Sequence, residues 1–159
     1  MSRFRISIES DLAAVFVVSV LVRGVCEHLG MDSAETSSIE ICAVEAVTNS
    51  IKHAYDCAHG REVCVELLYT QDRLRLVVQD DGVSMPDQHR RTLTTGSNVF
   101  GFDPADLDRI PECGMGLEII RQAMDEISYS TIGGTNSLNM TKFLRKREPQ
   151  GILACNAPS

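Results

Sequence analysis

Residues 4–9 alternate apolar and polar side chains, with an apolar residue at every second position. A period of two is typical of a half-buried strand, so we expect a strand here, at the edge of a sheet. From Leu12 onward the apolar residues recur at helical spacing until Gly30, a residue favoured just after a helix. The pattern therefore predicts a long first helix, with Ser10 as its N-cap.

A second helix is indicated by apolar residues four positions apart, namely Ile39, Ala43, Val47 and Ile51. We expect this helix to follow a polar stretch at 32–38 and to end between Ala54 and Gly60. Alternation then returns on both sides of a turn at Gln71-Asp72. Residues 61–80 are therefore predicted to form an antiparallel hairpin.

Regular spacing disappears between Asp80 and Glu112, where Gly, Pro, Asp, Thr and Ser are common. A long stretch of this kind inside a compact domain is more often a lid or a binding loop than a simple connection. Beyond it, the apolar spacing at 117–124 predicts a third helix, and residues 127–132 and 138–144 predict two strands around Gly133-Gly134. These elements favour an α/β protein with an antiparallel sheet covered by helices on one face.

The composition is that of a folded protein, because 43% of the 159 residues are hydrophobic and only 23% are charged. We expect one domain over residues 1–147 and a tail without regular structure over 148–159. The 15 basic against 22 acidic residues leave a net charge of −7, which disfavours nucleic acid or an anionic membrane as a direct partner.

The longest apolar run, residues 12–22, is too short to cross a bilayer, which takes about 20 residues. Acidic residues stand before it where a secretion signal would be basic, so we expect a cytoplasmic protein. The six cysteines include no C-x-x-C pair, which favours reduced thiols.

Glu45, Asn49 and His53 lie at i, i+4 and i+8 of the predicted second helix. Each step of four residues turns by only about 40° around the axis, so the three side chains would share one face. Side-chain oxygens ligate hard cations such as Mg²⁺, and a carboxylate or an imidazole can act as a base. The stripe suits the chemistry of a Mg-nucleotide, although a polar helix face in contact with water is the alternative that spacing alone leaves open.

Two glycine-containing segments follow. Asp80-Asp81-Gly82-Val83-Ser84 comes at the end of a predicted strand, where loops often carry ligands, although a plain turn would explain it as well. Gly114-Met115-Gly116-Leu117 opens the third predicted helix, where free backbone N–H groups can bind phosphate, although glycines also occur there without a ligand. The order of the three features along the chain is what favours a nucleotide site.

The string E-x-x-x-N-x-x-x-H-A-Y at 45–55, the two glycine segments and Met140-Thr141-Lys142 together resemble the GHKL ATPase superfamily. Within it, the chain looks like the anti-sigma-factor serine/threonine-protein kinases of the RsbW type, over residues 3–146. The resemblance implies the histidine-kinase-type α+β two-layer sandwich, with a mixed, mostly antiparallel sheet covered on one face by helices, and an ATP lid. It implies ATP and Mg²⁺ as cofactors.

Carried over residue by residue, the resemblance implies that Asn49 coordinates Mg²⁺ on the phosphates of ATP. It implies that Glu45 is the general base for the attacking hydroxyl. His53 matches the family string without an assigned chemical role. Binding of the triphosphate at the helix start would fall to Gly114, Met115 and Gly116.

At the other end of the nucleotide, Asp80 would accept a hydrogen bond from the adenine amino group. Gly82 would let the backbone come close to the base, and Thr141 would support the adenine end. The chain departs from the family at Ser84, where a glycine is common. If the backbone there needed a positive φ, a serine would cost about 1 kcal/mol or more.

The implied activity is that of an anti-sigma factor and kinase, which phosphorylates an anti-sigma-factor antagonist and sequesters a sigma factor, as a homodimer without direct contact to nucleic acid. A nucleotide-dependent binding switch without kinase activity is the alternative, against which the presence of Glu45 argues. The catalytic part of a two-component histidine kinase and a soluble α/β protein with incidental polar residues are less favoured.

Overall fold

A computed structural model describes residues 1–95 and 115–144 of the chain, and the structural statements below refer to these residues. Five strands form one sheet in the order β1-β2-β3-β5-β4. Every pairing in this sheet is antiparallel, where the resemblance left room for a mixed sheet. The strands are β1 (Ser2–Glu9), β2 (Glu62–Tyr69), β3 (Arg73–Asp80), β4 (Glu126–Ile132) and β5 (Thr135–Phe143).

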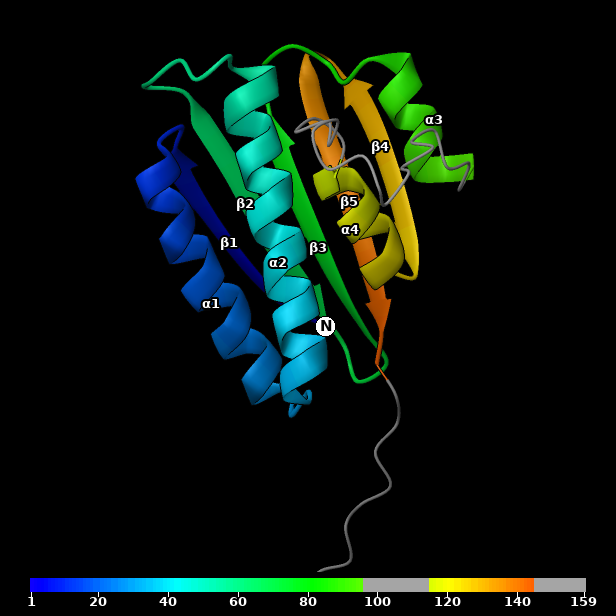
Figure 1. Ribbon diagram of the computed structural model, residues 1–159. Coiled ribbons are helices and arrows are strands. Elements are labelled where there is room, and N and C mark those ends of the chain that lie inside the picture. Colours follow the sequence, from blue (N-terminus) through cyan, green and yellow to red (C-terminus); the bar gives the residue numbers. More distant parts are fainter. Residues whose placement is uncertain (96–114, 145–159) are drawn as a thin grey trace, which may run out of the picture.

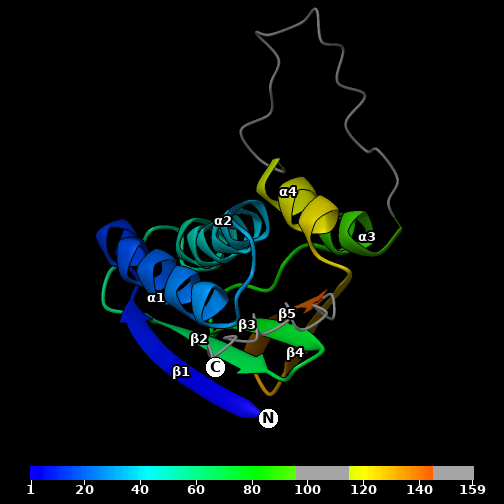
Figure 2. The same ribbon diagram turned by 90° about the horizontal axis from the view of Figure 1, so that it is seen from below.

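The helices lie together on one face of this sheet (Figures 1 and 2). A short 3-10 turn (Leu12–Ala14) leads into α1 (Val15–His28), and α2 (Ser33–Asn49) continues into a π-helical turn (Ser50–Ala54). The remaining helices are α3 (Asp87–Thr95) and α4 (Met115–Ala123). The expected α+β two-layer fold is therefore confirmed.

The core lies between the two layers because alternate strand residues point toward the helices. On β3 these are Leu74, Leu76 and Val78, and on α2 Ile39 and Val47 meet them, all 2% exposed or less. Burying a side chain of this size contributes about 1.5–3 kcal/mol relative to leaving it in water. The same alternation brings Asp80, two residues beyond Val78, to the helix side at the end of the strand.

The predicted edge strand, the 61–80 hairpin and the last two strands are confirmed, but three boundaries were wrong. Asp11 and not Ser10 caps the first helical turn, and Ser10 is buried, with its hydroxyl donating to the carbonyl of Ala58. The stretch 32–38 belongs to α2, because Asp32 accepts a hydrogen bond from the Glu35 N–H and starts the helix there. The segment expected to lack structure contains α3.

Part of the predicted lid (96–114), including Gly114, and the predicted tail (148–159) lie outside the described residues. None of the helices in the described ranges is long and apolar enough to cross a membrane.

The four cysteines in the described ranges are free thiols. Three are buried, and Cys57 is exposed. Burial between the helices raises the pKa of Cys26 and of Cys42 to about 11, so both thiols stay protonated near neutral pH.

Candidate functional site

The end of α2 and the end of β3 form the walls of a cavity of about 270 Å³. Its lining is mostly apolar, with a few polar groups from distant parts of the chain, which is typical of sites for small molecules. Asn49, His53 and Asp80 contribute from these two walls. The remaining wall comes from the segment after β3, from α3 and α4, and from the β4–β5 hairpin, through Ser84, His89, Leu117, Tyr129 and Leu138.

Asp80 is held as a hydrogen-bond acceptor at the edge of this cavity. Its Oδ1 accepts from the Gly82 N–H at 3.1 Å and from Asn136 Nδ2 at 2.7 Å, and its Oδ2 accepts from Ser50 Oγ at 2.8 Å. Asn136 is opposite Asp80 in the pairing of β3 with β5. Three donors from three segments therefore fix the carboxylate.

The neighbouring Asp81 has a different role, although both carboxylates stand in the same predicted segment. Asp81 Oδ1 accepts from Arg61 at 2.9 Å and from the Tyr55 hydroxyl at 2.8 Å, and the pKa of Asp81 is lowered by these bonds, the one from Arg61 first. Tyr55 ends the π-helical turn. Asp81 thus ties the end of α2 to the end of β3, while Asp80 faces the cavity.

Gly82 lies against the carbonyl group of Ala54. A Cβ added at Gly82 would overlap the carbonyl oxygen and would lie 2.6 Å from the carbonyl carbon. The N–H of Val83 donates to the same oxygen at 2.8 Å. The close approach of two backbones, and not a ligand alone, therefore requires glycine at this position.

Glu45 lies one turn before Asn49 and contacts the beginning of α4. A Cβ at Gly116 would overlap Glu45 Oε2 and would lie 3.1 Å from its Cδ. The carboxylate therefore packs on the first turn of α4, where the helix dipole favours negative charge. Glu45 is not among the residues that line the cavity with Asn49 and His53.

Asn49 carries a polar atom without a partner. Its Nδ2 is inaccessible to solvent and has no hydrogen-bond partner among the described residues. A buried donor in this state costs about 1–3 kcal/mol, which an acceptor such as a phosphate oxygen can offset. No group of three or more His, Cys, Asp or Glu side chains in the described ranges could hold a metal by itself. A side-chain amide oxygen next to bound phosphates fits Mg²⁺, which is usually held by few protein ligands and by substrate oxygens.

The structure does not bring Thr141 to this cavity. Thr141 pairs with Arg75 and Glu126, and its odd offset from Asn136 along β5 turns it to the sheet face without helices. Asn136, and not Thr141, is the residue of β5 that lies opposite Asp80. Sequence reasoning missed Asn136 because only the strand register places it there.

Ser84 also belongs to the site, and the strain considered for it does not arise. In the described ranges, the non-glycine residues with positive φ are Asp56 and Cys57, so the φ of Ser84 is negative. The serine hydroxyl instead donates to Asn136 Oδ1 at 2.9 Å.

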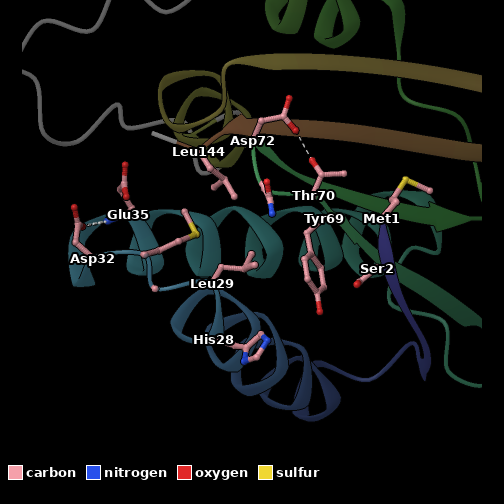
Figure 3. A pocket seen from close by; sticks show the side chains of 13 residues that line it. Met1, Ser2, His28, Leu29, Asp32, Glu35, Tyr69, Thr70, Asp72 and Leu144 are labelled. Atoms are coloured by element: carbon pink, nitrogen blue, oxygen red, sulfur yellow. Dashed lines mark hydrogen bonds between the residues drawn. The ribbon is translucent and has the colours of Figure 1, made fainter. Parts of the chain in front are cut away.

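A wider cavity of about 1240 Å³ lies at the opposite end of α2 and β3 (Figure 3). Two of its carboxylates serve the local structure, since Asp32 caps α2 and Asp72 accepts from the Thr70 hydroxyl in the β2–β3 turn. Among the described residues, none of those that the sequence predicts as site residues lines this wider cavity. The smaller cavity is therefore the candidate site.

Residues 8–142 match the family described as the histidine kinase-like ATPase domain. Because the match covers most of the chain, the protein belongs to this family of ATPase domains. The α+β two-layer fold agrees with this assignment.

Within the family, the chain is similar to serine-protein kinases RsbW over most of its length. The RsbW of Bacillus pumilus (strain SAFR-032) is 30% identical over 138 residues, which are 83% of this chain and 80% of the relative. That of Bacillus cereus (strain Q1) is 31% identical over 153 residues, with 93% and 91% covered. That of Halalkalibacterium halodurans is 33% identical over 135 residues, with 84% and 78% covered. The resemblance to the RsbW-type family is confirmed.

A solved structure, the SiaB-SiaC complex from Pseudomonas aeruginosa, aligns with a TM-score of 0.57 and covers 87% of this chain and 88% of the matched chain. The identity is 11%, so this likeness concerns the fold alone.

Proposed function

We propose that the protein binds ATP with Mg²⁺ in the smaller cavity and transfers the γ-phosphoryl group to a serine or threonine of a partner protein. The observation that carries the proposal is the fixed acceptor Asp80 facing an apolar cavity whose other wall holds the unpartnered amide of Asn49. The membership in a kinase-like ATPase family and the similarity to serine-protein kinases support it.

In this proposal Asp80 accepts a hydrogen bond from the adenine amino group through the remaining lone pair of Oδ2. Gly82 keeps the backbone close to Ala54 and donates to Asp80. It would therefore set how far the adenine base enters the cavity. We assign the support of Asp80 to Asn136, and we assign no nucleotide contact to Thr141.

Asn49 would hold Mg²⁺ through its side-chain oxygen, and the ion would supply neutralisation of the charge on the phosphates. Gly114, Met115 and Gly116 are proposed for the triphosphate at the start of α4, where the N–H groups of a first helical turn can bind anions.

Glu45 is proposed as the general base. Its carboxylate takes the proton from the attacking hydroxyl as the oxygen bonds to the γ-phosphorus and the bond to the bridging oxygen of ADP breaks. Its place beside Gly116 puts it next to the helix turn proposed for the phosphates. Such transfer depends mainly on positioning and charge neutralisation, so no nucleophile of the protein itself is required.

The partners we propose are an anti-sigma-factor antagonist as the phosphorylated protein and a sigma factor as the sequestered one, in the cytoplasm. We propose a homodimer that forms through α1, because Phe16, Val17 and Val20 are exposed on this helix. Apolar groups gathered on one surface are typical of protein interfaces.

The first test is calorimetric titration with ATP, with and without Mg²⁺, for the wild type, Asp80→Asn and Asp72→Asn. Asp72 directly precedes β3 and Asp80 is its last residue, but only Asp80 lines the smaller cavity, so Asp72→Asn is the control. We expect binding that Mg²⁺ strengthens, that Asp80→Asn weakens and that Asp72→Asn leaves unchanged. Absence of binding by the wild type at millimolar ATP would refute the proposed site.

The second test measures phosphotransfer to candidate antagonists by Glu45→Gln, with Glu35→Gln at the other end of α2 as the control. We expect Glu45→Gln to abolish transfer and to retain ATP binding, because the base acts on the acceptor hydroxyl. Binding of ATP and of a partner without transfer by the wild type would instead favour a nucleotide-dependent switch.

A further inference from the structure

Three polar side chains from different segments meet behind Asp80. Ser84 lies between β3 and α3, Thr131 lies near the end of β4, and Asn136 lies near the start of β5. The hydroxyls of Ser84 and Thr131 are 2.9 Å and 2.8 Å from Asn136 Oδ1, and 3.1 Å from each other. None of the expected nucleotide contacts explains this cluster.

The side-chain amide of Asn136 has all its hydrogen bonds formed. Its two N–H donors reach Asp80 Oδ1 at 2.7 Å and the Gly82 carbonyl at 3.1 Å, and its oxygen accepts from the two hydroxyls. The residue is 1% exposed, so water does not compete for these groups. An amide has two donors and two acceptor lone pairs, and this pattern fits only one of its two orientations.

The orientation of the Asn136 amide matters because the reversed orientation would place its oxygen next to other acceptor oxygens. With the amide reversed, its oxygen would face Asp80 Oδ1 and the Gly82 carbonyl, and its NH₂ group would face two hydroxyls. The carboxylate would then lose a donor and turn away from its position. Asp80 and the Gly82 carbonyl can only accept, so they fix which side of the amide carries the NH₂ group. The two hydroxyls donate to the amide oxygen and so hold the amide in the place from which it positions Asp80.

We infer that Ser84 and Thr131 are positioning residues for nucleotide selection, which orient Asn136 so that Asp80 accepts a 6-amino group of a purine. The inference rests on the proposed ATP site and extends it to residues outside the expected contacts. It gives the hydroxyl of Ser84 a role in the site.

The test compares ATP with inosine triphosphate, which carries an oxygen in place of the 6-amino group. The variants are Ser84→Ala with Thr131→Val, Ser84→Thr as the conservative change that keeps a hydroxyl, and Ser128→Ala as the control. Ser128 is also on β4 but pairs with Asn139 on the sheet face away from Asp80. Binding is measured by calorimetry, and folding by thermal unfolding.

We expect the double variant to lose about tenfold in the ratio of ATP to inosine triphosphate affinity, the effect of about one hydrogen bond. Ser84→Thr and Ser128→Ala should keep the ratio of the wild type. A ratio unchanged in the double variant would overturn the inference. A merely structural role would weaken both nucleotides alike, and that outcome would also overturn it.

A second measurement works without nucleotide. Exchange of the Asn136 side-chain NH₂ protons, followed by NMR, should be slow in the wild type and faster in the double variant. If the wild type bound neither nucleotide, the proposed function would fail, and amide exchange alone would decide whether the two hydroxyls orient Asn136. Equal exchange in both proteins would refute that orientation.

Discussion

Replacing Gly82 with alanine tests the contact that brings β3 to the end of α2. The added Cβ would lie 2.6 Å from the carbonyl carbon of Ala54 and 2.8 Å from Cδ1 of Tyr55. Backbone and a buried ring cannot both yield at small cost, because Tyr55 is 6% exposed and its hydroxyl is bonded to Asp81. The end of β3 must therefore move away from α2.

The size of the effect follows from three contributions to the free energy of unfolding. Overpacking costs about 1–3 kcal/mol. Loss of the Val83 N–H bond to Ala54 costs about 0.5–1.5 kcal/mol. Alanine reduces the conformational entropy of the unfolded chain, which stabilises the folded state by about 0.4–1 kcal/mol. The net loss is about 2 kcal/mol, which lowers Tm by roughly 4–8 °C for a chain of this length.

The assays are thermal and urea unfolding, and ATP titration below the transition. Gly24→Ala is the control, since a Cβ at Gly24 in α1 meets nothing within 4 Å and should stabilise the helix by about 1 kcal/mol. ATP binding should weaken in Gly82→Ala because the Gly82 N–H positions Asp80. Unfolding and ATP affinity equal to the wild type would refute the reasoning.

Three further predictions concern single side chains. Burial raises the pKa of Tyr55 to about 12, so stability should be complete below pH 10 and fall as the pH rises toward 12. Urea unfolding of Tyr55→Phe should lack this fall, and an identical alkaline profile would contradict it. Gly116→Ala should displace Glu45 and slow phosphotransfer by about tenfold or more in a single-turnover assay. An unchanged rate would refute this prediction. Asn49→Ala should weaken ATP much more with Mg²⁺ than without it, and equal losses would remove Asn49 from metal binding.

Much of the secondary structure could be predicted from local patterns. The alternation at 4–9 and 61–80 identified strands because each has one face in the core and one in water. The second helix begins earlier than its apolar spacing indicates, because its first turn is polar and starts at the cap formed by Asp32.

The predicted site residues divide by the kind of information that locates them. Asn49 and Asp80 are predicted because each lies in a local string typical of a known family, and both line the candidate cavity. Thr141 was chosen from a string in the same way, but the register of β5 turns it to the other face of the sheet. A shift of one residue along a strand reverses the direction of the side chain, so residue type alone cannot place it.

By itself, the sequence determined the class of fold, the order along the chain of the five strands and of the helices other than α3, and the chemical groups available at the ends of α2 and β3. These depend on spacing along the chain, which periodic burial makes visible. Only the tertiary structure decided that Asn136 supports Asp80, that Ser84 needs no strained backbone, and that Glu45 packs against Gly116. Such contacts join residues far apart in the chain, and they exist only after the strands are in register and the two layers are packed.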